Sequence, residues 1–214
     1  MEQEVNSPVI REDSRHGYFM KQALAMGEKA LATGETPVGC VLVYNDKIVG
    51  SGMNDTNRSM NGTRHAEFLA IAEMLQTYPK SAIKETDLYV TVEPCIMCTA
   101  ALRQYGIRSV FVGTHNERFG GVGGVLTVHS DKSIDPPYPV YVGLYRKEAI
   151  TLLRQFYIQE NEKGKIIDEV KRGEEKNKTR LTLIPAPNPR PKKNRALNTT
   201  FDFEDDDQDF MPIV

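Results

Sequence analysis

Helical and extended hydrophobic patterns alternate along residues 16–160, and this alternation restricts the fold more than any other feature of the chain. Apolar side chains recur at helical spacing from Tyr18 to Leu31, and Gly34 follows as a natural helix stop. The later segments are expected to be strands at 38–44, 48–52, 87–92 and 109–113, and helices at 65–75, 94–105 and 146–159. Residues 114–139 are expected to be a long loop. Helices alternating with strands favour a layered α/β domain in which helices pack on a mixed sheet.

The composition changes near residue 160. Residues 161–195 carry 11 basic and 5 acidic residues, whereas residues 196–214 carry 6 acidic residues and no basic one. The prolines between Pro185 and Pro191 are incompatible with a helix, and sequence of this kind buries too little apolar surface to offset its ordering entropy. We therefore expect a flexible N-terminal segment at 1–15, one domain at 16–160, and a largely disordered basic-then-acidic tail at 161–214.

Three classes of protein are disfavoured by the composition. The chain has only three cysteines and no charged-then-apolar leader, so a secreted disulfide framework is not expected. No apolar run approaches the roughly 20 residues of a membrane helix, so we expect no membrane partner. The 27 Lys+Arg residues are balanced by 29 Asp+Glu residues, which argues against a simple basic nucleic-acid binder. We expect a soluble intracellular protein.

Two short stretches carry residues suited to chemistry: His65-Ala66-Glu67 and Pro94-Cys95-Ile96-Met97-Cys98. A Cys-x-x-Cys pair alone is compatible with a redox pair, half of a structural zinc site, or two buried apolar positions. The remaining cysteine and histidines are Cys40, His16, His115 and His129. We expect the cysteine to be buried packing in an apolar strand, and the three histidines to be surface or loop residues rather than ligands.

The combination of the two stretches favours a catalytic zinc site. Cys95 and Cys98 are three residues apart at an expected helix start, where they share one face and where the helix dipole favours thiolates. His65 would complete a Cys₂His set and leave the fourth zinc position open, as in catalytic sites. Glu67 lies two residues beyond His65, about 200° around a helix, so it is placed to carry protons rather than to bind the metal. The pattern H-x-E…P-C-x-x-C is typical of zinc nucleobase deaminases.

Several further stretches extend this pattern over most of residues 16–160. They are Thr36–Gly39, Met53–Asn57, His65–Phe68, Thr91–Cys98, Asn116–Gly121, and Arg146–Ile150 with Leu153-Arg154 and Phe156-Tyr157. On these stretches the chain resembles the catalytic subunits of the eukaryotic heterodimeric tRNA-specific adenosine deaminases, which make inosine at the anticodon wobble position. The resemblance implies a cytidine-deaminase-like fold, a three-layer α/β/α sandwich with a mixed five-stranded sheet.

The resemblance also implies roles for individual residues. His65, Cys95 and Cys98 would hold Zn²⁺, and Glu67 would be the catalytic proton shuttle. In the substrate pocket, the residues implied are Asn54 as a hydrogen-bond partner of the flipped base, Val38 as a pocket-lining residue, and Asn116 near the ribose. From the residues alone, Asn-Asp after a strand is more often plain turn chemistry, so the role of Asn54 depends on the resemblance.

The resemblance further implies two partners: a tRNA anticodon loop, and a homologous non-catalytic deaminase-like subunit in which the catalytic glutamate is replaced. We expect the protein in the nucleus and cytoplasm. Two alternatives stay open, a deaminase of free cytosine nucleotides and a non-catalytic zinc-stabilised RNA-binding subunit, although Glu67 argues against the second. The glycine-rich run 120–124 lacks the helix and the Lys-Ser/Thr of a phosphate cradle, so we interpret it as a flexible, close-approach loop.

Overall fold

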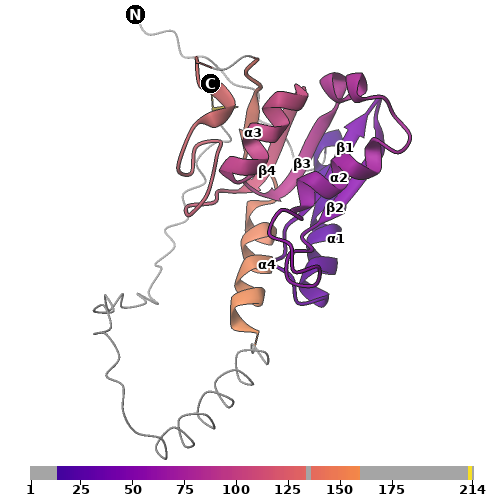
Figure 1. The fold of residues 1–214 in the computed structure, drawn as a ribbon. Helices are drawn as coiled ribbons and strands as arrows, with labels where there is room; N and C mark the ends of the chain where they lie inside the picture. The colour runs from indigo at the N-terminus through magenta and orange to yellow at the C-terminus, as the bar shows by residue number, and fades with distance from the viewer. Residues whose placement is uncertain (1–13, 134–135, 160–211, 214) are drawn as a thin grey trace, which may run out of the picture. The chain divides into compact units, whose positions relative to one another are not determined.

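The structure, a computed structural model, describes residues 14–133, 136–159 and 212–213, and its elements follow the expected alternation (Figure 1). In chain order they are α1 (Arg15–Ala32), β1 (Gly39–Tyr44), β2 (Lys47–Met53), α2 (Ala66–Met74), η1 (Lys80–Glu85), β3 (Asp87–Val92), α3 (Ile96–Tyr105), β4 (Ser109–Thr114), η2 (Val128–Ser130), β5 (Val140–Val142), α4 (Arg146–Ile158) and β6 (Pro212–Ile213). A second compact unit, residues 159–208, lies outside the described residues beyond its first position. The expected N-terminal segment lies outside them up to residue 13, and the expected tail lies outside them except for β6.

The sheet is mixed, with strand order β2-β1-β3-β4-β5-β6. β1 and β2 form the expected antiparallel hairpin, and the positive φ angles of Asn45 (49°) and Asp46 (58°) suit the tight turn between them. β1 also pairs antiparallel with β3, whereas β3, β4 and β5 run parallel. The five expected strands are therefore β1 to β5, and the two-residue β6 extends the sheet antiparallel to β5.

The strand β5 was not expected from the hydrophobic pattern, which placed only four strands. β5 has three residues, which is shorter than the four to eight that make a readable strand signal. The short helices η1 and η2 were missed for the same reason, since each covers only a turn or two. The start of α3 also differs: it begins at Ile96 rather than at Pro94, and Cys95 is its N-cap residue.

Two apolar layers separate the sheet from its helices, which confirms the three-layer sandwich. Along β1, Cys40 and Leu42 belong to the layer shared with α2 and α3, and Val41 and Val43 belong to the layer shared with α1 and α4. Every residue of β3 and of β4 is buried, as is usual for strands covered on both faces. No helix within the described ranges is long and apolar enough to cross a membrane.

The site is positioned by the ends of two neighbouring strands. β3 and β4 are parallel, so their carboxyl ends meet at one edge of the sheet, the usual place for a site in an open α/β sheet. α3 starts just after β3 ends, and α2 starts beside it. α2 lies directly on β2, because a Cβ added at Gly52 would be 2.0 Å from the carbonyl oxygen of Ala66. Only glycine allows this close approach.

Candidate metal centre and active site

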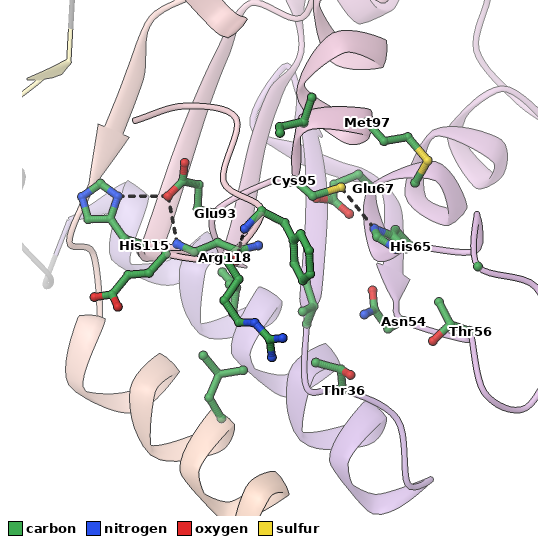
Figure 2. A pocket seen from close by; sticks show the side chains of 18 of the residues that line it. Thr36, Asn54, Thr56, His65, Glu67, Glu93, Cys95, Met97, His115 and Arg118 are labelled. Carbon is green, nitrogen blue, oxygen red and sulfur yellow. Dashed lines mark hydrogen bonds and ion pairs between the residues drawn. The ribbon is translucent and has the colours of Figure 1, made fainter. Parts of the chain in front are cut away.

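Three side chains from two helix starts converge on one point. The Nδ1 atom of His65 lies 3.5 Å from the Sγ atom of Cys95 and 3.5 Å from the Sγ atom of Cys98. The three possible ligand atoms all lie within 4.8 Å of one another. Figure 2 shows the side chains of His65 and Cys95, both of which line a pocket, pointing toward each other. The structure thus brings together the three residues expected to hold a metal.

The helix termini explain why these three side chains meet. His65 is the N-cap residue of α2 and Cys95 is that of α3, with Cys98 in the first turn of α3. The thiols of Cys95 and Cys98 therefore lie where unpaired N–H groups and the helix dipole favour negative charge. A hydrogen bond donated by Cys98, with a further one donated by the imidazole of His65, lowers the pKa of Cys95 to about 4. The same hydrogen bond between the two cysteines, together with burial, raises the pKa of Cys98.

The donor set fits Zn²⁺. Two thiolates and one imidazole are preferred zinc ligands, and three protein ligands leave one coordination position for water or substrate. Cys98 is buried, whereas His65 and Cys95 are half-buried and line the pocket, so the open side of the group faces the space where a substrate would enter. Within the described part of the chain, no other group of three or more His, Cys, Asp or Glu side chains has this arrangement.

Glu67 lies beside this group with an incomplete set of hydrogen bonds. It is 3% exposed, and its Oε2 atom has no hydrogen-bond partner among the described residues. Burial, joined by the charge on Cys95, raises the pKa of this carboxyl above its usual range. A carboxylate that is desolvated, near a metal site and free at one oxygen is suited to accept and release protons.

A pocket of about 730 Å³ opens in front of the metal group. Val38, Asn54 and Asn116, which were expected to meet the substrate, all line it. The carbonyl oxygens of both asparagines are engaged in the fold: Asn54 Oδ1 accepts the N–H of Ala66 (3.0 Å), and Asn116 Oδ1 accepts the N–H of Phe119 (3.1 Å). Their contacts with a substrate stay predictions.

The other cysteine and histidines do not join the metal group. Cys40 is fully buried in β1, as expected. His16 bonds the hydroxyl of Tyr89 (2.8 Å) and is half-buried, and His115 pairs with Glu93 (3.0 Å). The expectation of a surface or loop position was wrong for His129, which lies in η2 and is fully buried.

Sequence reasoning missed two buried glutamates, Glu35 and Glu93, that shape the pocket walls. Glu35 is 1% exposed and accepts the backbone N–H groups of Asn57 and Arg58. Glu93 is 2% exposed and accepts three backbone N–H groups. An acidic residue directly after a strand rich in β-branched and other apolar residues, as Glu93 is after β3, was the signal available in the sequence.

Comparisons with known proteins agree with this geometry. The sequence profile described as the cytidine and deoxycytidylate deaminase zinc-binding region matches residues 13–114. The chain is 50% identical over 161 residues to the tRNA-specific adenosine deaminase subunit tad2 of Schizosaccharomyces pombe, covering 75% of this chain but only 42% of that protein. It is 47% identical over 151 residues to the tRNA-specific adenosine deaminase 2 of Xenopus tropicalis, covering 67% of this chain and 89% of that one.

A solved structure has the same fold. It comes from a study of A-to-I editing by tRNA:A34 deaminases at the wobble position of transfer RNA. The two chains superpose with a TM-score of 0.58 at 31% identity, covering 64% of this chain and 99% of that one.

Proposed function

We propose a function from the premise that this chain belongs to the tRNA-specific adenosine deaminase family. The chain hydrolytically deaminates adenosine to inosine at the wobble position of tRNA anticodons and releases ammonia. The observation that carries the proposal is that one pocket is lined by residues of the His-Cys-Cys group and by a buried glutamate, one oxygen of which has no partner in the described part of the chain.

The chemistry divides between the metal and Glu67. When held by His65, Cys95 and Cys98, Zn²⁺ supplies the Lewis acidity that makes water a nucleophile at neutral pH. The Glu67 carboxylate accepts a proton from the attacking water and delivers it to N1 of the adenine, so that C6 becomes electrophilic. A C6–O bond forms, and Glu67 carries the second water proton to the departing amine as the C6–N bond breaks. Adenosine and water are thereby converted into inosine and ammonia.

The position of Glu67 limits which substrates can react. Because Glu67 is 3% exposed, the target base must leave its stack and enter the pocket to reach it. A base in an anticodon loop is already outside a duplex, so its unstacking costs less than in double-stranded nucleic acid.

The proposal includes a second subunit, homologous and non-catalytic. Apolar side chains are exposed around the pocket mouth and on the loop beside it: Ile96 (38%), Met97 (38%), Phe119 (57%), Val125 (48%) and Leu126 (50%). Clusters of exposed apolar side chains mark interaction surfaces. The nearly balanced charge of the chain also favours a partner that contributes to tRNA binding. Residence in the nucleus and cytoplasm remains a prediction, which fractionation checks.

The deciding experiment measures adenosine-to-inosine conversion in tRNA and ammonia release from free cytosine nucleotides, with and without the partner. We expect inosine at the wobble position and no turnover of free nucleotides. Ammonia release from cytosine nucleotides alone would support the free-nucleotide alternative, and no deamination of any substrate would support the non-catalytic one.

Two substitutions separate the metal ligands from the proton carrier. Cys95→Ala or Cys98→Ala is expected to lose both zinc and activity, whereas Glu67→Ala is expected to keep zinc and lose turnover. Full zinc content in either cysteine variant, measured by metal analysis, would contradict the assignment of that cysteine as a ligand.

A further inference from the structure

The loop that forms one wall of the pocket is organised around a single carboxylate, that of Glu93. We propose that Glu93 is a positioning residue: it holds this wall, residues 115–124, in the conformation that receives the substrate, and it connects the wall to the segment that carries the metal ligands. The inference rests on the proposed function for the identity of the substrate, but the order of the wall can be measured without any substrate.

Each carboxylate oxygen of Glu93 accepts two hydrogen bonds, so the side chain accepts four. Oε2 accepts the N–H of His115 Nδ1 at 3.0 Å, as Figure 2 shows. It also accepts the backbone N–H of Asn116 at 2.9 Å. Oε1 accepts the backbone N–H groups of Val122 and Gly124, each at 2.9 Å. The side chain of Glu93 has no exposed surface. One buried carboxylate thus joins the beginning and the end of the wall.

The glycines of the wall make room for this carboxylate. A Cβ added at Gly120 would lie 2.4 Å from Glu93 Oε1, and one added at Gly124 would lie 2.5 Å from Oε2. The run 120–124 is therefore a close-approach loop, as expected, and its backbone donates hydrogen bonds to Glu93 from Val122 and Gly124. Its expected flexibility stays a prediction.

The wall is also bonded to the segment that carries Cys95. The N–H of Gly121 donates to the carbonyl of Pro94 (3.0 Å), and the N–H of Ile96 donates to the carbonyl of Phe119 (2.9 Å). Between these two bonds, Cys95 and Gly120 form an antiparallel bridge. The wall and the metal-ligand segment therefore adopt their positions together, and the carboxylate that fixes the wall lies two residues before a metal ligand.

The wall carries side chains that face the pocket. Asn116, Arg118 and Phe119 line it, and the bond from the Phe119 N–H to Asn116 Oδ1 closes the turn between them. If the wall lost its anchor, a substrate would have to order these residues on binding, and the free-energy cost of that ordering would appear as weaker binding. The reacting groups themselves would still be in place.

The inference requires a carboxylate rather than merely a side chain of this size. Ionised carboxylates accept at both oxygens, whereas an amide accepts at one and donates at the other. In Glu93→Gln the amide NH₂ would face two N–H donors on one side of the carboxyl position. The wall would be released while the volume of the side chain is preserved.

A fluorescent reporter tests the wall directly, because the chain contains no tryptophan. Phe119→Trp places one indole on the exposed wall, and acrylamide quenching and anisotropy then report its mobility. We expect Glu93→Gln in this background to increase quenching and lower anisotropy with zinc content unchanged. The matched control is Glu28→Gln, which removes the same charge from an exposed site in α1 and is expected to change neither signal. Unchanged quenching and anisotropy in Glu93→Gln would overturn the proposal.

Kinetics with tRNA, in chains without the reporter, test the consequence for the substrate. Glu93→Gln is expected to raise KM by about tenfold or more, the order of magnitude of one lost charge-assisted hydrogen bond, with a much smaller change in kcat. A fall in kcat with unchanged KM, or a loss of zinc, would overturn the proposal, since Glu93 would then act on the metal centre. If the unsubstituted chain together with its partner subunit did not deaminate tRNA, the proposed function would fail, while the reporter experiment would still decide the inference.

A second variant guards against a general loss of folding in Glu93→Gln. His115→Ala removes one of the four donors, and the His115 side chain is 43% exposed, so the fold tolerates its removal. We expect it to shift quenching and KM in the same direction by a smaller amount. His115→Gln, which retains an N–H donor, should restore both values toward those of the unsubstituted chain. Failure of His115→Ala to shift either value would count against the anchor.

Discussion

Two buried glutamates belong to the same pocket and differ in almost everything except their exposure. Glu67 is 3% exposed and Glu93 is 2% exposed. Among the residues that the structure describes, one oxygen of Glu67 has no hydrogen-bond partner, whereas Glu93 accepts four hydrogen bonds. Burial raises the pKa of Glu67; at Glu93 burial acts in the same direction, but the bonds from His115 and the backbone outweigh it and hold the pKa below its usual range.

The comparison separates chemistry from architecture. A buried carboxylate whose acceptor positions are filled stabilises the surrounding backbone and has little capacity left for a reacting molecule. Glu35, which precedes the pocket-lining Thr36, follows the same pattern as Glu93, since it accepts Asn57 N–H at 3.1 Å and Arg58 N–H at 2.7 Å. Glu35 and Glu93 thus hold backbone N–H donors, whereas Glu67, beside the metal group, has an oxygen with no hydrogen-bond partner among the described residues.

The rate of turnover should distinguish Glu67 from Glu93 most strongly. Glu67→Gln should lower kcat by about 10²–10⁴-fold, because it removes the group that carries protons. Zinc content should stay at the level of the unsubstituted chain, since Glu67 is not expected to be a ligand. Quantifying inosine in treated tRNA together with zinc checks both statements, and substantial residual turnover would remove Glu67 from the mechanism.

Stability should distinguish the two glutamates by sign. Glu93→Gln should lower the free energy of unfolding by about 3 kcal/mol, because it leaves buried N–H donors unsatisfied. Glu67→Gln should leave the free energy unchanged or raise it, because it removes a buried charge that lacks a full set of partners. Urea denaturation of both variants at the same zinc concentration measures the two free energies of unfolding. Destabilisation of similar size in both would mean that the two carboxylates have the same structural role.

The position of the start of α2, next to His65, depends on Gly52, and a methyl group at this glycine should displace it. Gly52→Ala should cost about 2 kcal/mol, because its Cβ would meet the Ala66 carbonyl at 2.0 Å and displace the start of α2. Because α2 carries His65, zinc affinity should fall as well. Gly62→Ala is the control for stability, since an added Cβ there has no atom within 4 Å. Equal thermal stability and zinc content of the two variants would contradict this prediction.

The smallest expected effect is a pH dependence of the stability contributed by the pair of His115 and Glu93. The bond to Glu93 raises the pKa of His115, with burial opposing the shift. The ion pair therefore contributes fully below the unfolded-state pKa of about 6.5, and its contribution is lost as pH rises through the higher folded-state pKa. Between about pH 6 and 8 the chain should lose stability relative to His115→Gln, by less than about 1 kcal/mol because the pair is partly solvated. Parallel curves of Tm against pH for the two proteins would contradict the assignment.

The hydrophobic pattern predicted the elements that bury a long apolar face. β3 was predicted with its observed bounds, and α1, α2 and α4 to within a few residues, because each repeats its pattern over several turns or pleats. β5 has three residues and β6 has two, too few for a repeat to be visible. The fifth strand was expected only through the family resemblance.

For the site, spacing along the chain predicted the residues that act near their own helix starts. His65, Glu67, Cys95 and Cys98 form two compact motifs, and the structure places them together. Glu93 and Glu35 carry no such motif, because their partners are mostly backbone N–H groups 22 to 31 residues away in the chain. Backbone donors are present in every sequence, so only the folded chain reveals which carboxylate they meet.

The strand order gives the metal group a further consequence. His65 follows β2 and Cys95 follows β3, and β1 lies between these two strands in the sheet. An ion held by both residues is therefore a cross-link over three strands, between positions 30 residues apart in the chain. Because the cross-link exists only in the folded state, each tenfold rise in free zinc above its dissociation constant adds about 1.4 kcal/mol to the stability of that state. Zinc binding and folding are therefore linked equilibria. A low concentration of free zinc would reduce the amount of folded enzyme as well as its activity.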